Sequence, residues 1–151
     1  MKSKIEFYST RGEYGCFSNF SKHFVYLKDK NWLTSEHYYQ AQKFAGTEYE
    51  EEIRLLKTPG EAANRGRDKS LPLRTDWEQV KDDVMREVIY AKFTQNSDCK
   101  KVLLSTDDAM LIEHTTKDFY WGDGGDGSGK NMLGTILMEI REKIINESKK
   151  Q

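Results

Sequence analysis

The sequence predicts an α+β fold, a mainly helical single domain over residues 1–151 with a small β-sheet. Apolar residues recur at helical spacing over 76–95 and 131–146, and the later segment forms one continuous apolar stripe. Short β-favouring segments next to turn residues occur at 5–8 and 24–27. We see no linker, repeat or low-complexity segment that would divide the chain, so we expect one domain.

The elements are expected in the following order. A strand over 5–8 precedes a turn, and a second strand over 24–27 turns back through 29–31 toward Trp32 as a hairpin. Thr34 or Ser35 caps a helix that runs to about Ala45, where Gly46 plausibly stops it. Further helices are expected over 49–56, 59–65, 76–95, 98–104 and 131–146, with a buried strand over 110–113.

Composition excludes some classes of protein. The chain has 24 basic and 25 acidic residues, whereas a dedicated nucleic-acid-binding protein usually shows a basic excess. Its two cysteines, Cys16 and Cys99, form neither a disulfide framework nor a zinc-ligand spacing. There is no apolar stretch typical of a signal peptide or a membrane span. We therefore expect a cytoplasmic protein without a membrane partner, and the sequence leaves its oligomeric state open.

The helix over 35–44 carries the first candidate site. Glu36, Gln40 and Lys43 fall within one narrow sector of a helical wheel. A carboxylate, an amide and an amine on one rigid face suit a site that carries protons and orients a substrate. The alternative is a solvated polar stripe, with His37, Ala41 and Phe44 facing the core. The pattern alone favours this alternative.

A glycine-rich segment, 120–131, carries the second candidate site. Five glycines occupy positions 122–131 and a helix follows, so backbone amides could hold a phosphate. The alternative is a flexible surface loop. We favour function because Trp121 opens the segment and Lys130 closes it. The spacing nearly matches a nucleotide-binding P-loop, but Asn131 stands where Ser or Thr should hold magnesium, which argues against a kinase or NTPase.

Two further segments are weaker candidates. Residues 64–75 have a net charge of +3, and Arg67 lies within them, which suits either a phosphate contact or a solvated loop. In the turn over 14–20, Phe17 could stack on a base and Asn19 could contact its polar edge, although a core turn is favoured. The three histidines show no ligand spacing, so we predict neither a metal nor a cofactor.

Taken together, these segments resemble the NADAR family over essentially the whole chain. The resemblance lies in an ordered set of motifs, each of which is weak when taken alone. They are 7–9, 15–20, 32–44, 65–68, 91–93, 113–115, 120–125, 129–134 and 137–141.

The resemblance implies a mainly helical α+β fold and hydrolysis of N-glycosidic bonds. Some family members act on early riboflavin-pathway intermediates, the ribosylamino-pyrimidine phosphates, and others remove ADP-ribose from guanine bases. Both substrates contain a base-like nitrogen on the anomeric carbon of a phosphorylated ribose. We therefore expect a phosphorylated ribosyl small molecule as substrate, with an ADP-ribosylated nucleic-acid base as the alternative. A non-catalytic sensor of ADP-ribose or nucleotide is the competing hypothesis.

The chemistry of such a reaction suggests roles for these side chains. We expect Glu36 to activate water or to stabilise an oxocarbenium-like sugar, with Asp123 as the alternative carboxylate. Lys43 could donate a proton or capture an opened ribose as a Schiff base. The substrate-binding residues are expected to be Phe17, Asn19, Gln40, Arg67, Trp121, Gly122, Gly129, Lys130 and Asn131.

Overall fold

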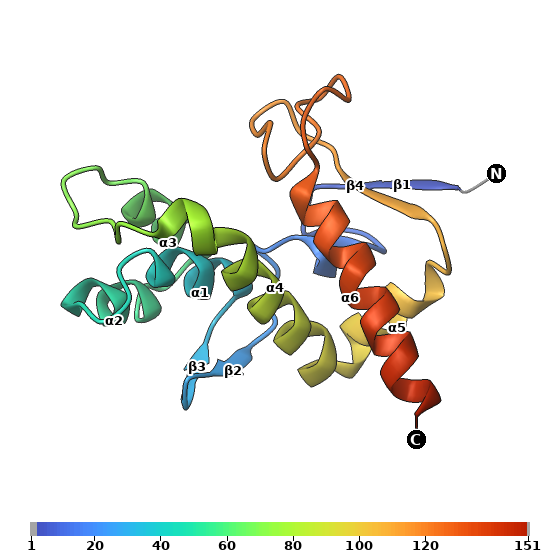
Figure 1. The fold of residues 1–151 in the computed structure, drawn as a ribbon, viewed down its shortest axis with the longest axis horizontal. Helices are drawn as coiled ribbons and strands as arrows, with labels where there is room; N and C mark the ends of the chain where they lie inside the picture. Colours follow the sequence, from blue (N-terminus) through green and yellow to red (C-terminus); the bar gives the residue numbers. More distant parts are fainter. Residues whose placement is uncertain (1–2, 151) are drawn as a thin grey trace. The chain divides into compact units, whose positions relative to one another are not determined.

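The computed structural model describes residues 3–150. The chain divides into two compact units, of which unit 1 comprises Met1–Ser18 and Asn96–Gln151, and unit 2 comprises Asn19–Gln95 (Figure 1). The single domain expected over residues 1–151 stays a prediction. None of the helices in residues 3–150 is long and apolar enough to cross a lipid bilayer.

Unit 1 is built on a pair of parallel strands from distant parts of the sequence. Strand β1 (Lys4–Phe7) pairs with β4 (Met110–Glu113), so that Lys4 lies opposite Met110 and Phe7 opposite Glu113. The long helix α6 (Met132–Lys149) packs on β4 and also contacts α5 (Ser97–Ser105). Its apolar stripe is buried, as the helical spacing predicts, and consists of Leu133, Ile136, Leu137, Ile140 and Ile144. The short helix η1 spans Gly15–Phe17.

Unit 2 places one short helix among most of its other elements. A hairpin of β2 (Val25–Leu27) and β3 (Lys30–Trp32) leads into α1 (Ser35–Gln42). Helix α1 contacts β3 and the three helices that follow it, α2 (Glu48–Arg54), α3 (Pro59–Gly66) and α4 (Trp77–Gln95). All eight residues of α1 are buried. Polar side chains on this helix therefore need partners inside the protein.

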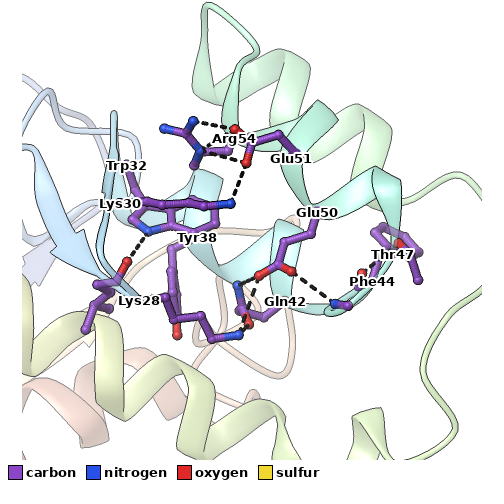
Figure 2. Close-up of polar contacts among 12 residues, drawn as sticks. Lys28, Lys30, Trp32, Tyr38, Gln42, Phe44, Thr47, Glu50, Glu51 and Arg54 are labelled. Atoms are coloured by element: carbon purple, nitrogen blue, oxygen red, sulfur yellow. Dashed lines mark hydrogen bonds and ion pairs between the residues drawn. The ribbon is translucent and has the colours of Figure 1, made fainter.

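Ion pairs and hydrogen bonds join the hairpin to α2 and to the end of α1 (Figure 2). Glu50 accepts hydrogen bonds from the Gln42 side chain at 2.9 Å and the Gly46 amide at 3.0 Å. Lys28 donates to Gln42 at 2.5 Å. Glu51 pairs with Arg54 and, at 2.8 Å, with Lys30 of β3. These contacts hold the side of α1 that bears Gln42.

The predicted fold class and elements are confirmed, with three differences. Helix α1 ends at Gln42 rather than near Ala45. After it, the amides of residues 43–45 bond to the carbonyls three positions earlier, as in turns, and Gly46 follows with a φ of 83°. The strands within residues 3–150 form two separate pairs rather than one sheet. In the hairpin, Lys28 and Asp29 both have positive φ, as a tight two-residue turn requires, so the turn lies slightly before residues 29–31.

Candidate active site

The N-terminus of α1 is fixed by side chains, and this fixes the position of Glu36. The Thr34 hydroxyl accepts a hydrogen bond from the His37 amide at 3.1 Å, as an N-cap residue does. The Glu36 amide donates to the Asn19 carbonyl at 3.1 Å, and the Ser35 hydroxyl donates to the Asn19 side chain at 2.8 Å. Asn19 is buried and supports the start of this helix, and its expected contact with substrate stays a prediction.

His37 is a structural residue of the core. Its side chain is fully buried, with Nδ1 2.8 Å from the Thr34 hydroxyl and Nε2 2.9 Å from the Leu56 carbonyl. Burial lowers the pKa of this imidazole, because the charged form loses its hydration. Ala41 and Phe44 are buried as well, so the inward face expected for this helix is confirmed.

The polar face of α1 is not a solvated stripe. Glu36 is only 8% exposed and Gln40 only 4%, and Lys43 is half-buried. Gln40 Nε2 donates to Glu36 Oε2 at 2.6 Å, which holds one carboxylate oxygen in place. Lys43 Nζ donates to the carbonyl of Gly66 at 3.2 Å. A carboxylate, an amide and an amine thus lie along one buried face.

Lys43 is in an environment that disfavours its charge. Burial lowers the pKa of its amine, and the nearby cations Arg67 and Lys81 lower it further, while Glu36 opposes the shift. Its bond to Gly66 partly offsets the burial, because the last carbonyls of a helix such as α3 lack intrahelical donors and attract cations. A lysine with a lowered pKa is both a better proton donor at neutral pH and a more available nucleophile.

Arg67 adds positive charge close to this cluster. It follows the last residue of α3 and is exposed. Its neighbour Arg65 is already paired with Glu52 and Asp68. Among the described residues Arg67 forms no ion pair, so it is the arginine of this segment that can receive an anionic group.

In unit 1, the glycine-rich loop mainly bonds to itself. The amides of residues 123, 124, 129, 130, 131, 132 and 133 all donate to backbone carbonyls, at 2.8–3.1 Å. Gly122 and Gly129 allow two parts of the loop to touch, since a Cβ atom on Gly129 would lie 2.5 Å from the Gly122 carbonyl oxygen. The amides at the start of α6, which the sequence suggested for a phosphate, are therefore used in closing the loop.

Asp123 organises this loop. Its Oδ1 accepts the amides of Thr115 and Gly125 at 3.0 and 2.8 Å, and its Oδ2 lies 2.8 Å from His114 Nδ1. The pair lowers the pKa of Asp123 and raises that of His114, to which Glu6, 3.3 Å away, also contributes. Donor atoms of Glu6, His114 and Asp123 are close enough for a metal ion, but the same geometry is that of an ion pair whose buried carboxylate is already saturated.

The other predicted binding residues of unit 1 differ in what they can offer a ligand. Asn131 bonds to β4 with both ends of its amide, at 2.9 Å each, so its side chain is structural. Phe17 is fully buried and packs edge-on against Phe7, which favours the core interpretation. Trp121 is half-buried against Tyr120, and Lys130 is exposed with its amine 5.4 Å from the centre of the Tyr120 ring. Trp121 and Lys130 therefore both keep some surface exposed to solvent.

Two residues that matter here were not singled out from the sequence. Gly66 meets both Gln40 and Lys43, and His114 pairs with Asp123. A glycine directly after the expected helix over 59–65 is a usable signal for Gly66, because glycine permits a close approach of other groups to the backbone. No local pattern links His114 to Asp123, since their contact depends on how the loop closes.

Comparisons with known proteins identify related sequences. The family model described as "NADAR domain" matches residues 6–145. The N-glycosidase YbiA of Escherichia coli (strain K12) is 53% identical over 143 residues, which cover 95% of this chain and 89% of that protein. The chloroplastic riboflavin biosynthesis protein PYRR of Zea mays is 43% identical over 156 residues, covering 93% of this chain but 25% of that longer protein.

A solved structure is also similar. The NMR structure of the E. coli protein YbiA has a TM-score of 0.93 and 51% sequence identity, and the match covers 100% of this chain and 90% of that one. The resemblance inferred from the ordered motifs is thereby confirmed, and the chain belongs to the NADAR family.

Proposed function

We propose that this protein hydrolyses the N-glycosidic bond of a phosphorylated ribosyl compound, most readily a ribosylamino-pyrimidine phosphate of early riboflavin synthesis. It is an N-glycosyl hydrolase, as are the relatives named N-glycosidase. The observation that carries the proposal is the buried polar face of α1, where Glu36 and a lysine of lowered pKa lie on one rigid helix. A protein that only binds its ligand has no need to keep both groups there.

Glu36 is assigned to the sugar side of the reaction. Breaking the bond between carbon and nitrogen builds positive charge on the ribose ring, which a carboxylate stabilises. The same carboxylate can take a proton from the water whose oxygen forms the new bond to the anomeric carbon. Gln40 holds one oxygen of Glu36, which restricts how the carboxylate can turn. Asp123 is the alternative carboxylate, and the three donors bound to it support a role in closing its own loop.

Lys43 is assigned to the departing base. The nitrogen leaves with the electron pair of the broken bond and needs a proton, which a lysine ammonium of lowered pKa gives readily. The alternative is that the neutral amine adds to C1 of the ring-opened ribose, which is an imine of the base nitrogen; the base then leaves as its amine, and water hydrolyses the Schiff base that remains on Lys43. Treatment with borohydride during turnover distinguishes the two, because only the Schiff base is reduced to a stable adduct on Lys43.

The remaining contacts concern the phosphate and the base. In unit 2, exposed Arg67 is the cation assigned to phosphate. In unit 1, the roles expected for Lys130 and Trp121, a cation for phosphate and an aromatic face for the base, stay predictions. Relatives carry the name riboflavin biosynthesis protein, which supports a riboflavin-pathway substrate. The cytoplasmic location expected from the sequence belongs to the same proposal.

Product analysis by mass spectrometry tests the activity and the substrate together. Purified protein is incubated, without added metal, with a ribosylamino-pyrimidine phosphate and separately with an oligonucleotide that carries ADP-ribosyl guanine. Release of ribose 5-phosphate from the first is the expected result. Release of ADP-ribose from the second alone would replace the substrate with a modified base. If the protein binds both compounds and cleaves neither, the proposed enzyme activity is wrong and the hypothesis of a non-catalytic sensor is supported.

Glu36→Gln tests the role of the carboxylate. The amide keeps the size of the side chain but loses its charge and basicity, so kcat should fall by about 10²–10⁴-fold with little change in fold. Glu78→Gln is the matched control, because Glu78 lies on α4, is exposed and pairs with Lys81. Near-normal turnover of Glu36→Gln would remove Glu36 from the mechanism.

A further inference from the structure

The orientation of the Gln40 amide is fixed by Glu36. Nε2 must face the carboxylate, since the flipped amide would bring two acceptor oxygens together. Oε1 therefore points the other way. Among the buried side-chain nitrogen and oxygen atoms of residues 3–150, Gln40 Oε1 is the one without a hydrogen-bond partner. Such a buried acceptor costs stability, so its position calls for a reason.

The group that faces Gln40 Oε1 is Gly66, at the end of α3. A Cβ atom built on Gly66 would lie 2.0 Å from Oε1, 2.7 Å from Cδ and 2.9 Å from Cβ of Gln40. Gly66 does not have a positive φ, so its backbone would accept alanine, which helices prefer to glycine. The space, rather than the backbone, is what requires glycine at this position.

Gly66 also meets the second group of the site. Its carbonyl accepts the hydrogen bond from Lys43 Nζ, at 3.2 Å. Gly66 therefore contacts both parts of the polar face. Because it has no side chain, it leaves space for the Gln40 amide that bonds to Glu36, and its carbonyl accepts the hydrogen bond from Lys43.

We propose that Gly66 is a positioning residue that sets Glu36, through Gln40, and Lys43 directly. The proposal rests on the function proposed above, in which these two side chains do the chemistry. A side chain at position 66 would displace the Gln40 amide, release the carboxylate oxygen and shift the carbonyl that holds Lys43. The penalty should therefore depend on the presence of the Gln40 side chain.

A double-mutant cycle of Gly66→Ala and Gln40→Ala tests this dependence. In the wild-type background, Gly66→Ala should lower Tm by roughly 3–10 °C, as overpacking does in a chain of this size. It should lower kcat by about 10²-fold, as small misplacements of reacting groups do, with KM little changed. In the Gln40→Ala background the 2.0 and 2.7 Å contacts are gone, while Cβ of residue 40 would still lie 2.9 Å away, so the kcat loss caused by Gly66→Ala should be at least about 10-fold smaller.

Gly60→Ala is the matched control, because it lies in the same helix and its Cβ would meet only the Thr58 hydroxyl oxygen, at 3.9 Å. It should keep wild-type turnover and show no coupling to Gln40→Ala. If Gly66→Ala does not fold alone but folds together with Gln40→Ala, the steric coupling is supported. Failure to fold in both backgrounds, or equal kcat and Tm losses in both, would overturn it.

A readout independent of turnover separates this proposal from the proposed function. Reductive methylation followed by peptide mass spectrometry gives the reactivity of Lys43, with exposed Lys69 as internal reference. Gly66→Ala should raise the reactivity of Lys43 several-fold, because the amine loses its carbonyl partner, and Gly60→Ala should not. If the wild type cleaves nothing, these labelling and Tm results still decide the role of Gly66; unchanged labelling with a full loss of kcat would contradict it.

Discussion

The polar face of α1 and the glycine-rich loop contain similar kinds of groups, but they differ in how those groups are satisfied. In the loop, backbone amides find carbonyls within unit 1, and Asp123 accepts three hydrogen bonds. On α1, a buried acceptor has no partner and a half-buried amine has a lowered pKa. Polar groups whose hydrogen bonds are all made stabilise a fold. Buried acceptors without a partner and groups of shifted pKa are typical of sites that act on a substrate.

This difference changes the weight of the sequence-based candidates. The glycine-rich loop was the stronger candidate from the pattern, because glycines before a helix often hold phosphate. The helix was the weaker one, because polar residues on a helix are usually solvated. The contacts favour the polar face of α1 over the loop as the place of the chemical step. The mutations below test this difference between the two regions.

The largest effect is expected for Lys43→Met. Turnover should fall by about 10³-fold, in the middle of the range for a lost acid or base. Stability should be equal to or higher than that of the wild type at pH 7, because the lowered pKa means that the folded state disfavours the charged amine. The stability penalty on the wild type is absent above the unfolded pKa and grows as the pH falls through the folded pKa.

Thermal unfolding at pH 7 and near pH 10.5, together with kcat, checks this prediction. The advantage of Lys43→Met over the wild type should shrink at the higher pH. Lys69→Met, at an exposed position, is the control for removal of a charge. Normal turnover of Lys43→Met would show that this lysine, like the groups of the loop, serves the fold and not the reaction.

The second effect is expected for Asp123→Ala, and it concerns stability. Removing the carboxylate leaves the amides of Thr115 and Gly125 without their acceptor, which should cost about 2–4 kcal/mol of unfolding free energy. Denaturant titration measures the loss. Asp126→Ala is the matched control, since exposed Asp126 bonds only to Ser128 in the same loop and should change stability by less than about 1 kcal/mol. Wild-type stability with no turnover would instead make Asp123 the catalytic carboxylate.

Local features of the chain were predictable because they depend on neighbours in the sequence. The N-cap Thr34, the position of Pro59 in the first turn of α3, and the apolar stripe of α6 follow from propensity and periodicity. The shared sector of Glu36, Gln40 and Lys43 follows from helical geometry. Their burial did not, because it depends on α2, α3 and α4 packing around α1.

The loop shows the opposite limit of sequence reasoning. Its glycines predict that another group comes close to the backbone, and the structure contains such contacts. They do not predict whether that group belongs to a ligand or to the loop itself. Asn131 illustrates the point, since its amide bridges to β4 across about 20 positions of sequence. Contacts of this kind are set by tertiary structure and leave no spacing to read.

The smallest effect is expected for His114→Gln, and it should depend on pH. Asp123 and Glu6 raise the folded pKa of His114 above its ordinary value, so the stability that this pair contributes is present below about pH 6.5 and is lost as the pH rises through the folded pKa. The wild type should therefore unfold at a higher temperature than His114→Gln at pH 6, and the two should converge by pH 9.

The histidines themselves provide the sharper measurement. In an NMR titration of the wild type, His114 should titrate above its ordinary range and buried His37 below it, because one gains anionic partners while the other loses hydration. Asp123→Ala should move the His114 midpoint downward and leave that of His37 in place. If the His114 midpoint does not change in Asp123→Ala, the ion pair does not contribute to the closed loop. Hydrogen bonds of the backbone amides would then be what closes it.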